Sequence, residues 1–135
     1  MSRMMIGLSL AALLFALPAS AGNGSGSFEY VERCEGAFCL RIEAASVNTA
    51  NGAVVWECAA TAPGALRTRI ACGIADLADS WRSVDVNGPV AWTEAVYQYA
   101  PGDPHDVEAC FEASADFLGT VVTQERTCAT ILVGP

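Results

Sequence analysis

The stretch VEACFEASADFLGTVVTQERTCATILV, residues 107–133, decides the fold class of this chain. From Val107 to Phe117, apolar side chains at the odd positions alternate with cysteine and polar side chains at the even positions. Successive side chains of a strand point to opposite faces, so this alternation is typical of a half-buried β-strand. Leu118-Gly119 then interrupts the alternation and predicts a turn into a second strand over residues 120–133.

Pairing these two strands symmetrically about Gly119 places Cys110 opposite Cys128 and Glu112 opposite Arg126. The same register pairs apolar side chains with each other, Ala109 with Ala129 and Val107 with Ile131. Such agreement favours the register, because cross-strand pairs stabilise a sheet. Cys110 lies between two carboxylates in the alternation, so we expect a Cys110–Cys128 disulfide on the face turned away from the core.

The turn signal Pro63-Gly64-Ala65 predicts a second hairpin, in which residues 54–62 pair with residues 66–75. Symmetry about Ala65 sets Cys58 opposite Cys72 on the apolar face. The opposite face of this expected hairpin carries polar side chains from both strands: Glu57, Thr61, Arg67 and Arg69.

The remaining cysteines, Cys34 and Cys39, enclose a four-residue segment that predicts a hairpin loop. Six cysteines permit many pairings, and the local pattern favours the nearest-neighbour bridges 34–39, 58–72 and 110–128. A bridge between two sheets, such as Cys72–Cys110, is the alternative. We expect no metal site, because no Cys-x-x-Cys pair is present and His105 does not stand at zinc-finger spacing from any cysteine pair.

Eight strands are expected in all, over residues 28–34, 39–47, 53–62, 66–75, 81–86, 90–99, 106–117 and 120–133. Asn87-Gly88 predicts a hairpin turn between the fifth and sixth of them, and residues 75–80 have the length of a single helical turn. Short strands separated by turn residues indicate a β-sandwich or a small barrel. We therefore expect an all-β chain with one antiparallel β-sandwich over residues 28–135.

The segments CAATAPGALRTRIAC (residues 58–72) and ACFEASADFLGTVVTQERTCA (residues 109–129) resemble small secreted bacterial proteins with an immunoglobulin-like β-sandwich. Most proteins of that kind have no known role. The resemblance implies an immunoglobulin-like sandwich of seven to eight strands and export from the cell. It transfers no catalytic residue to this chain.

Residues 1–21 have the order of a secretory signal peptide. Arg3 precedes an apolar run, and Ala19-Ser20-Ala21 supplies the small residues of a cleavage site. The apolar run is shorter than a membrane span needs, so we expect no span in the mature chain. Residues 22–27 (GNGSGS) read as a flexible leader, and the six cysteines agree with an oxidising, extracellular location.

The chain is acidic, with 15 Asp and Glu against 7 basic residues, all of them Arg, and a net charge of −8. A field of this sign repels nucleic acid and disfavours an anionic membrane surface. We therefore expect no nucleic-acid partner, and the sequence carries no motif that predicts a cofactor. An acidic surface also keeps an exported protein soluble.

His105 is the one histidine of the chain and lies among carboxylates in PGDPHDVE, residues 101–108. A histidine in this setting can act as a general base, but a triad requires a nucleophile such as Ser80, Ser83 or Ser114, and no nucleophile-elbow motif is present. The oxygens of Asp103, Asp106 and Glu108 suit Ca²⁺, yet the EF-hand pattern is absent. The prolines and glycine instead predict a surface turn, and we expect no catalytic residue here.

Trp56 is expected in the core, whereas Trp92 and Tyr97 are the candidates for a binding surface. Export, disulfides and strands without a catalytic constellation predict a non-enzymatic module that acts by surface contact. Its partner is then an extracellular protein or glycan. Two alternatives are a small secreted hydrolase that uses His105 and a secreted enzyme inhibitor that presents the loop between Cys34 and Cys39.

Overall fold

The computed structural model describes residues 28–100 and 104–134. It contains eight strands, as the sequence predicts. Their bounds are β1 Phe28–Glu35, β2 Phe38–Thr49, β3 Ala53–Thr61, β4 Arg67–Ile74, β5 Leu77–Asn87, β6 Val90–Gln98, β7 His105–Asp116 and β8 Val121–Val133. The expected signal peptide and leader, residues 1–27, lie outside the described residues.

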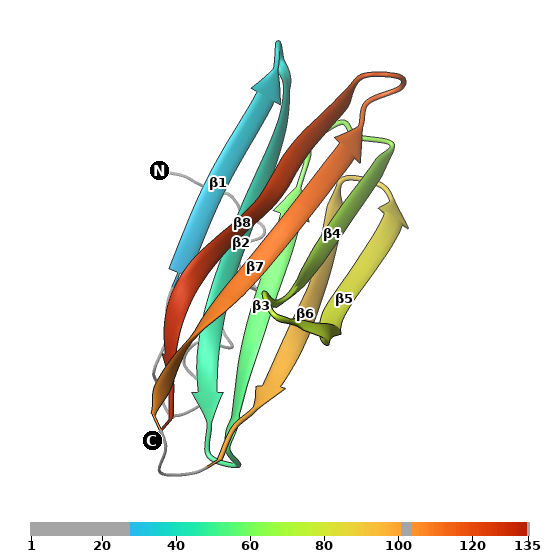
Figure 1. The fold of residues 1–135 in the computed structure, drawn as a ribbon. Helices are drawn as coiled ribbons and strands as arrows, with labels where there is room; N and C mark the ends of the chain where they lie inside the picture. The colour runs from blue at the N-terminus through green and yellow to red at the C-terminus, as the bar shows by residue number, and fades with distance from the viewer. Residues whose placement is uncertain (1–27, 101–103, 135) are drawn as a thin grey trace.

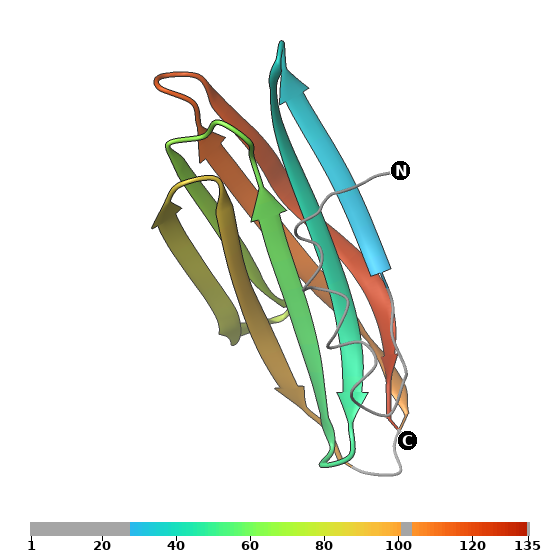
Figure 2. The same ribbon diagram turned by 180° about the vertical axis from the view of Figure 1, so that it is seen from behind.

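The strands form two antiparallel sheets of four strands each. Sheet A has the order β1-β2-β3-β6, and sheet B has the order β5-β4-β7-β8. Sheet B lies nearer the viewer in Figure 1. Figure 2 shows the molecule from behind, so sheet A lies nearer the viewer there. The chain is therefore all-β, and the two sheets pack face to face.

Apolar side chains from the inner faces of both sheets form one core cluster. Its largest fully buried members are Trp56 on β3, Phe111 on β7, and Leu40 and Ile42 on β2. The indole Nε1–H of Trp56 donates to the backbone carbonyl of Cys110 at 3.0 Å. That bond crosses from one sheet to the other and satisfies a buried donor, which is costly to leave unpaired.

The β7–β8 hairpin has the predicted register near the cysteines, because Cys110 pairs with Cys128 and Val107 with Ile131. A β-bulge shifts the register by one residue between Phe111 and Ala113. The predicted charge pair survives this shift, with Arg126 Nε 3.4 Å from Glu112 Oε1.

The predicted hairpin between residues 54–62 and 66–75 is wrong, because β3 belongs to sheet A and β4 to sheet B. The connection between them bonds to both sheets: Ala62 N–H donates to the carbonyl of Pro89, and Leu66 N–H donates to the carbonyl of Asp116. The Pro63-Gly64 turn therefore carries the chain across the core. The apolar faces of the two strands meet between the layers and not side by side within one sheet.

The Asn87-Gly88 signal also marks a crossing between sheets, since β5 and β6 lie in different sheets. Thr68 is fully buried on β4, and its hydroxyl donates to the Gly88 carbonyl at 2.8 Å.

The prediction of a helical turn at residues 75–80 is also wrong, because β5 already begins at Leu77. The Ser80 hydroxyl holds the tight turn before it, accepting from Ile74 N–H at 2.8 Å and donating to the Leu77 carbonyl at 2.6 Å.

The structure contains the three nearest-neighbour disulfides that the sequence favours, and no described cysteine is free. Cys34–Cys39 and Cys110–Cys128 join paired residues within a sheet. The third, Cys58–Cys72, joins β3 to β4 inside the core cluster and so connects the two sheets. The predicted partner of Cys58 is thus correct, although the hairpin that predicted it does not form.

Candidate interaction surface

The outer face of sheet A carries an unusual mixture of side chains for a solvent-facing surface. We define the sheet A face by the outward side chains that the pairing of its four strands sets in rows: Phe28, Tyr30, Glu32, Arg41, Glu43, Ala45, Val47, Val55, Glu57, Ala59, Thr61, Val90, Trp92, Glu94 and Val96. One row runs Tyr30, Glu43, Ala59, Trp92, and the next runs Phe28, Ala45, Glu57, Glu94. Figure 2 views the molecule from this side. Carboxylates therefore lie in the middle of a largely apolar face.

Glu57 is the most enclosed carboxylate of this face. It is only 7% exposed although its β3 neighbours Trp56 and Cys58 point the opposite way, into the core. Its strand partner on β6 is Glu94, so two carboxylates stand side by side. Burial, followed by the charge of Glu94, raises the pKa of Glu57 to about 7. Burial also raises the pKa of Glu43, against the opposing effect of Arg41.

No described side chain compensates the carboxylate of Glu57. Within residues 28–100 and 104–134, no hydrogen bond or ion pair reaches it, and its main charged neighbour is another glutamate. The nearby cation on this face is Arg41, whose Nε is 3.0 Å from Glu32 Oε2. Among the described side chains, the fully buried polar atom without a partner is Asn48 Oδ1, so the oxygens of Glu57 keep some contact with solvent although the residue as a whole is 7% exposed.

Exposed aromatic side chains flank these carboxylates. Trp92 on β6 is 44% exposed, and Phe28 and Tyr30 at the β1 edge are exposed to a similar degree. Trp92 pairs with Ala59, one outward position along the strands from the Glu57–Glu94 pair. Diagonal neighbours on one face are about 7–8 Å apart, within reach of an indole ring.

The two residues expected to form a binding surface point in opposite directions. Trp92 lies on the sheet A face and is 44% exposed. Tyr97 is an odd number of residues further along β6, so it faces inward and packs against the core cluster. Its hydroxyl is 3.0 Å from His105 Nε2 at the end of the molecule where β7 begins. The structure therefore does not bring Trp92 and Tyr97 onto one surface.

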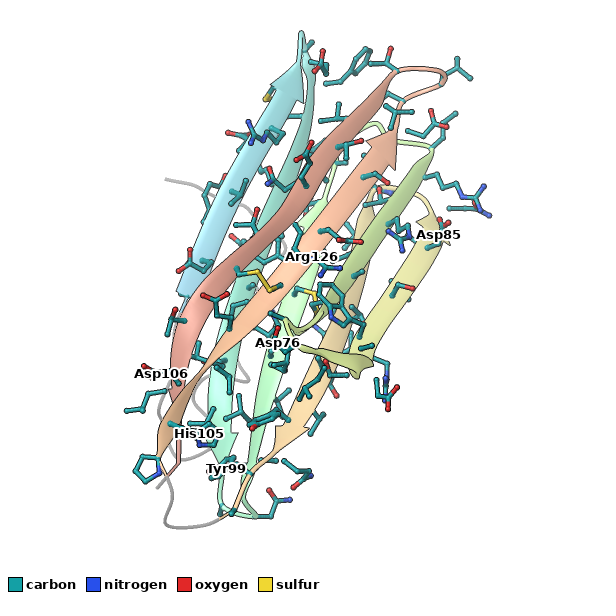
Figure 3. The ribbon with its side chains drawn as sticks, viewed as in Figure 1. Asp76, Asp85, Tyr99, His105, Asp106 and Arg126 are labelled. Carbon is teal, nitrogen blue, oxygen red and sulfur yellow. A yellow bond between two sulfur atoms is a disulfide. The ribbon has the colours of Figure 1, made fainter. Side chains whose placement is uncertain are left out.

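His105 is the first residue of β7, and the expected surface turn before it falls partly on residues 101–103, which are outside the described ranges. Figure 3 shows His105, Asp106 and Tyr99 near one end of the sheets. Among the expected nucleophiles, Ser114 lies nine residues further along the same strand, about 30 Å away. Ser80 uses its hydroxyl in the turn before β5, and Ser83 lies exposed further along β5.

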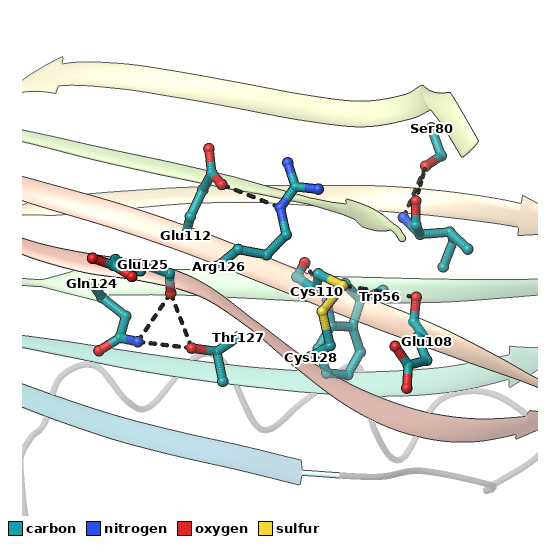
Figure 4. The surroundings of a disulfide bond; sticks show 11 residues. Trp56, Ser80, Glu108, Cys110, Glu112, Gln124, Glu125, Arg126, Thr127 and Cys128 are labelled. Carbon is teal, nitrogen blue, oxygen red and sulfur yellow. Dashed lines mark hydrogen bonds and ion pairs between the residues drawn. A yellow bond between two sulfur atoms is a disulfide. The ribbon is translucent and has the colours of Figure 1, made fainter. Parts of the chain in front are cut away.

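On the outer face of sheet B, in contrast, one arginine has both an aromatic and a carboxylate partner. The guanidinium carbon of Arg126 lies 4.2 Å from the centre of the Trp81 ring, and the same guanidinium pairs with Glu112. Beside this group lies the Cys110–Cys128 bridge, as Figure 4 shows. Cys110 is buried but does not belong to the core cluster, which agrees with its expected place on the outer side of the sheet.

The hairpin tip enclosed by Cys34 and Cys39 is tighter than expected. Glu35 and Phe38 still pair, so only Gly36 and Ala37 form the turn. The ring of Phe38 stacks on that of Phe117, 4.8 Å between centres, and thereby fixes the tip against the β7–β8 turn. A loop presented to a partner enzyme would need that side chain to be free.

Metal ligands do not converge elsewhere in the described part of the chain. The one group of three possible ligands there is Glu32, Cys34 and Cys39, and both cysteines are in a disulfide. Of the proposed calcium ligands, Asp106 and Glu108 are exposed, and Asp103 lies outside the described residues.

None of the described segments forms a helix with the length and apolarity that crossing a membrane requires. Comparison with known proteins finds no matching family model, no matching curated protein and no matching solved structure.

Sequence reasoning missed Glu57 because of the wrong hairpin. In that hairpin Glu57 shares its face with Arg67 and Arg69, which would compensate its charge. The structure places both arginines in sheet B, and Arg67 pairs with Asp85 at 2.9 Å. The signal that was available is a carboxylate at an outward position of an otherwise apolar strand, AVVWECAAT.

Proposed function

We propose that this protein is a secreted, non-enzymatic interaction module whose working surface is the sheet A face. The observation that carries the proposal is the exposure of Trp92, Val96 and Val90 in one line along β6, at 44%, 47% and 49%. Large exposed apolar groups that gather on one face mark interaction sites more often than isolated ones do. Tryptophan is also among the residues that dominate binding energy at interfaces.

The proposed location outside the cell is supported by the disulfides. Three bridges in a chain of 135 residues are typical of an oxidising compartment. The order of residues 1–21 adds an independent argument, because it is that of a cleavable export signal.

An immunoglobulin-like architecture is the finer fold assignment that we propose. If β2, β3, β4, β5, β6, β7 and β8 are named A, B, C, C′, E, F and G, the sheets read A-B-E and C′-C-F-G. That order corresponds to immunoglobulin sheets in which a C′ strand extends the C-F-G sheet. Two features differ: β1 adds a strand beside A, and the core disulfide joins B to C and not B to F. Many immunoglobulin-like domains act by surface contact, which supports the module hypothesis by analogy.

The proposal is tested by the binding of the fluorescently labelled protein to the surface and the secreted material of the cells that produce it. Trp92→Ala is expected to lower the bound fraction about 10-fold or more, because truncating an interface tryptophan removes a large contact. Leu132→Ala is the matched control, since Leu132 is apolar and 64% exposed on β8 of sheet B. Loss of binding in the control but not in Trp92→Ala would assign the surface to sheet B. A turnover activity that His105→Ala abolishes would replace the module by a hydrolase.

A further inference from the structure

Resting on the proposed function, we propose that the partner is a basic polypeptide segment, which docks on the sheet A face with a lysine or arginine side chain between Glu57 and Glu94. Two neighbouring carboxylates and the exposed aromatic groups around them make this part of the sheet suitable for a cationic side chain.

Glu57 is the carboxylate of this face that is least exposed to solvent. Its side chain is more than nine-tenths buried and, among the described residues, has neither a hydrogen-bond donor nor a cation as partner. Partial loss of solvent and the neighbouring charge of Glu94 both disfavour the ionised form, and a cation that arrives with its own donors offsets that cost. The carboxylate is therefore arranged to gain more from binding a cation than a solvated surface glutamate gains.

The Glu57–Glu94 pair supplies the geometry. The two residues are direct partners on β3 and β6, so their side chains project from neighbouring strands on the same side of the sheet. Directly opposed side chains have Cβ atoms about 4.5–5.5 Å apart. A guanidinium or ammonium group placed between them donates to both carboxylates, and arginine does so with a planar fork of donors.

The neighbouring Trp92 supplies a second contact for a cation or for its aliphatic stem. Its ring is partly exposed one outward position from Glu94 on the same strand. Arginine and lysine bind preferentially over the face of an indole, and their methylene chains pack on apolar surface. Val96, at the next outward position beyond Glu94, extends this apolar strip along β6.

Charge on this side of the molecule favours a basic partner. Four glutamates, Glu32, Glu43, Glu57 and Glu94, stand on the outer side of sheet A against the single Arg41, so this group has a net charge of −3. The whole chain adds to the field with its net charge of −8. A field of this sign accelerates the approach of a positively charged partner.

The shape of the face selects a polypeptide over a metal ion. The carboxylates of Glu43, Glu57 and Glu94 do not gather within the 4.8 Å that brings three ligand atoms onto one ion. The rows instead extend across four strands, about 14 Å from Tyr30 to Trp92. An extended chain with cations at alternate positions matches a surface of this width.

Binding is tested with the exported protein and a blocked 12-residue peptide in which arginine alternates with threonine, measured by calorimetry at pH 8. The matched peptide carries glutamine in place of arginine and is expected not to bind. Glu57→Gln and Trp92→Ala are each expected to weaken binding of the arginine peptide about 10-fold or more. Glu108→Gln removes one negative charge from an exposed position on β7 and is expected to change the affinity for the arginine peptide less than about 2-fold.

The pH dependence gives a second readout. The charged groups that face Glu57 are Glu94 on β6 and, diagonally on β2, Glu43, with Arg41 one outward position beyond Glu43. Protonation of Glu57 below neutrality removes the charge that the cation binds. Binding of the arginine peptide is therefore expected to weaken between pH 8 and pH 5.5 in the unmodified protein and to change much less in Glu57→Gln.

Several outcomes overturn the proposal. Equal weakening by Glu57→Gln and Glu108→Gln means that the peptide responds to net charge alone. A dimer in sedimentation that dissociates in Glu57→Gln assigns the face to a second copy of this chain. If the arginine peptide fails to bind while Trp92→Ala still abolishes binding to the producing cells, the interaction module stands and the basic partner falls. Thermal melting of each variant confirms that it is folded.

Discussion

Glu57 lies one residue after Trp56, yet the two side chains have opposite environments. The Trp56 indole is fully buried and donates to Cys110, whereas the Glu57 carboxylate faces outward with no described partner. The alternation of a strand makes this contrast unavoidable, because adjacent side chains point to opposite faces. The sequence predicts both orientations from this alternation, but it does not show that Glu57 is 7% exposed.

The pH dependence of stability follows from Glu57. Its pKa in the folded chain is about 7, above the ordinary value of 4.5, so the folded state binds more protons between these values. Stability therefore falls as pH rises from 4.5 to 7 and is level above that range with respect to this group. Glu57→Gln is expected to remove the decline and to raise the free energy of unfolding at pH 8 by about 1–2 kcal/mol, because solvent screens part of the charge of this group. Urea denaturation at pH 5 and pH 8 measures the free energy of unfolding of both proteins. The same decline between these pH values in Glu57→Gln as in the unmodified protein would contradict the prediction.

Gly73 permits the packing of Trp81 on the outer face of sheet B. A Cβ atom on Gly73 would lie 2.5 Å from Cγ of Trp81. Gly73→Ala is expected to displace the indole, disturb its contact with Arg126 and destabilise the protein by about 1–3 kcal/mol. In a double-mutant cycle with Trp81→Ala, the added methyl group should cost much less. Equal costs in both backgrounds, measured by thermal melting, would show that the clash is not the cause.

At the scale of the elements, hairpins within a sheet were predictable and crossings between sheets were not. The β7–β8 and β1–β2 pairs bring their cysteines together as the sequence predicts. The β3–β4 and β5–β6 connections have equally strong turn signals, but each joins the two sheets. A turn residue fixes local backbone geometry and leaves open whether the next strand pairs beside the last or across the core. Long-range hydrogen bonds such as Leu66 to Asp116 decide that choice.

The candidate site was predictable only as far as it depends on the alternation of side chains along one strand. Trp92 is exposed as expected, because it alternates with Ala91 and Thr93 on β6. Tyr97 was grouped with it by residue type, and the odd spacing places it on the other side of the strand. The importance of Glu57 depends on which strands flank β3, and that arrangement is set by the crossings.

The Cys58–Cys72 bridge is the covalent link between the sheets. It closes a segment with a sequence separation of 14, against 5 for Cys34–Cys39, and both of its sulfurs lie in the core cluster. The double variant Cys58→Ala/Cys72→Ala is expected to lose about 3 kcal/mol or more, because the longer loop gains more freedom on unfolding and two buried side chains are truncated. Cys34→Ala/Cys39→Ala is expected to lose about 2 kcal/mol or less. Urea midpoints compare the two, and a larger loss at the hairpin tip would contradict this ranking.

At the scale of the whole molecule, the two outer faces differ in how their charges are satisfied. On sheet B, Arg126 contacts both Trp81 and Glu112, and a disulfide lies beside them. On sheet A, Glu57 and Glu94 stand together without a described cation between them. The contrast between these two groups is the basis for placing the proposed binding surface on sheet A.

This asymmetry is tested most directly by nuclear magnetic resonance of the isotopically labelled protein during addition of the arginine–threonine peptide. The account predicts that backbone amide shifts change around Glu57, Trp92 and Glu94, and that the Glu57 carboxyl carbon titrates at lower pH once the peptide is bound. Residues of β5, β7 and β8 should stay unchanged. Shift changes centred on sheet B, or spread evenly over all acidic residues, would contradict a specific binding face on sheet A.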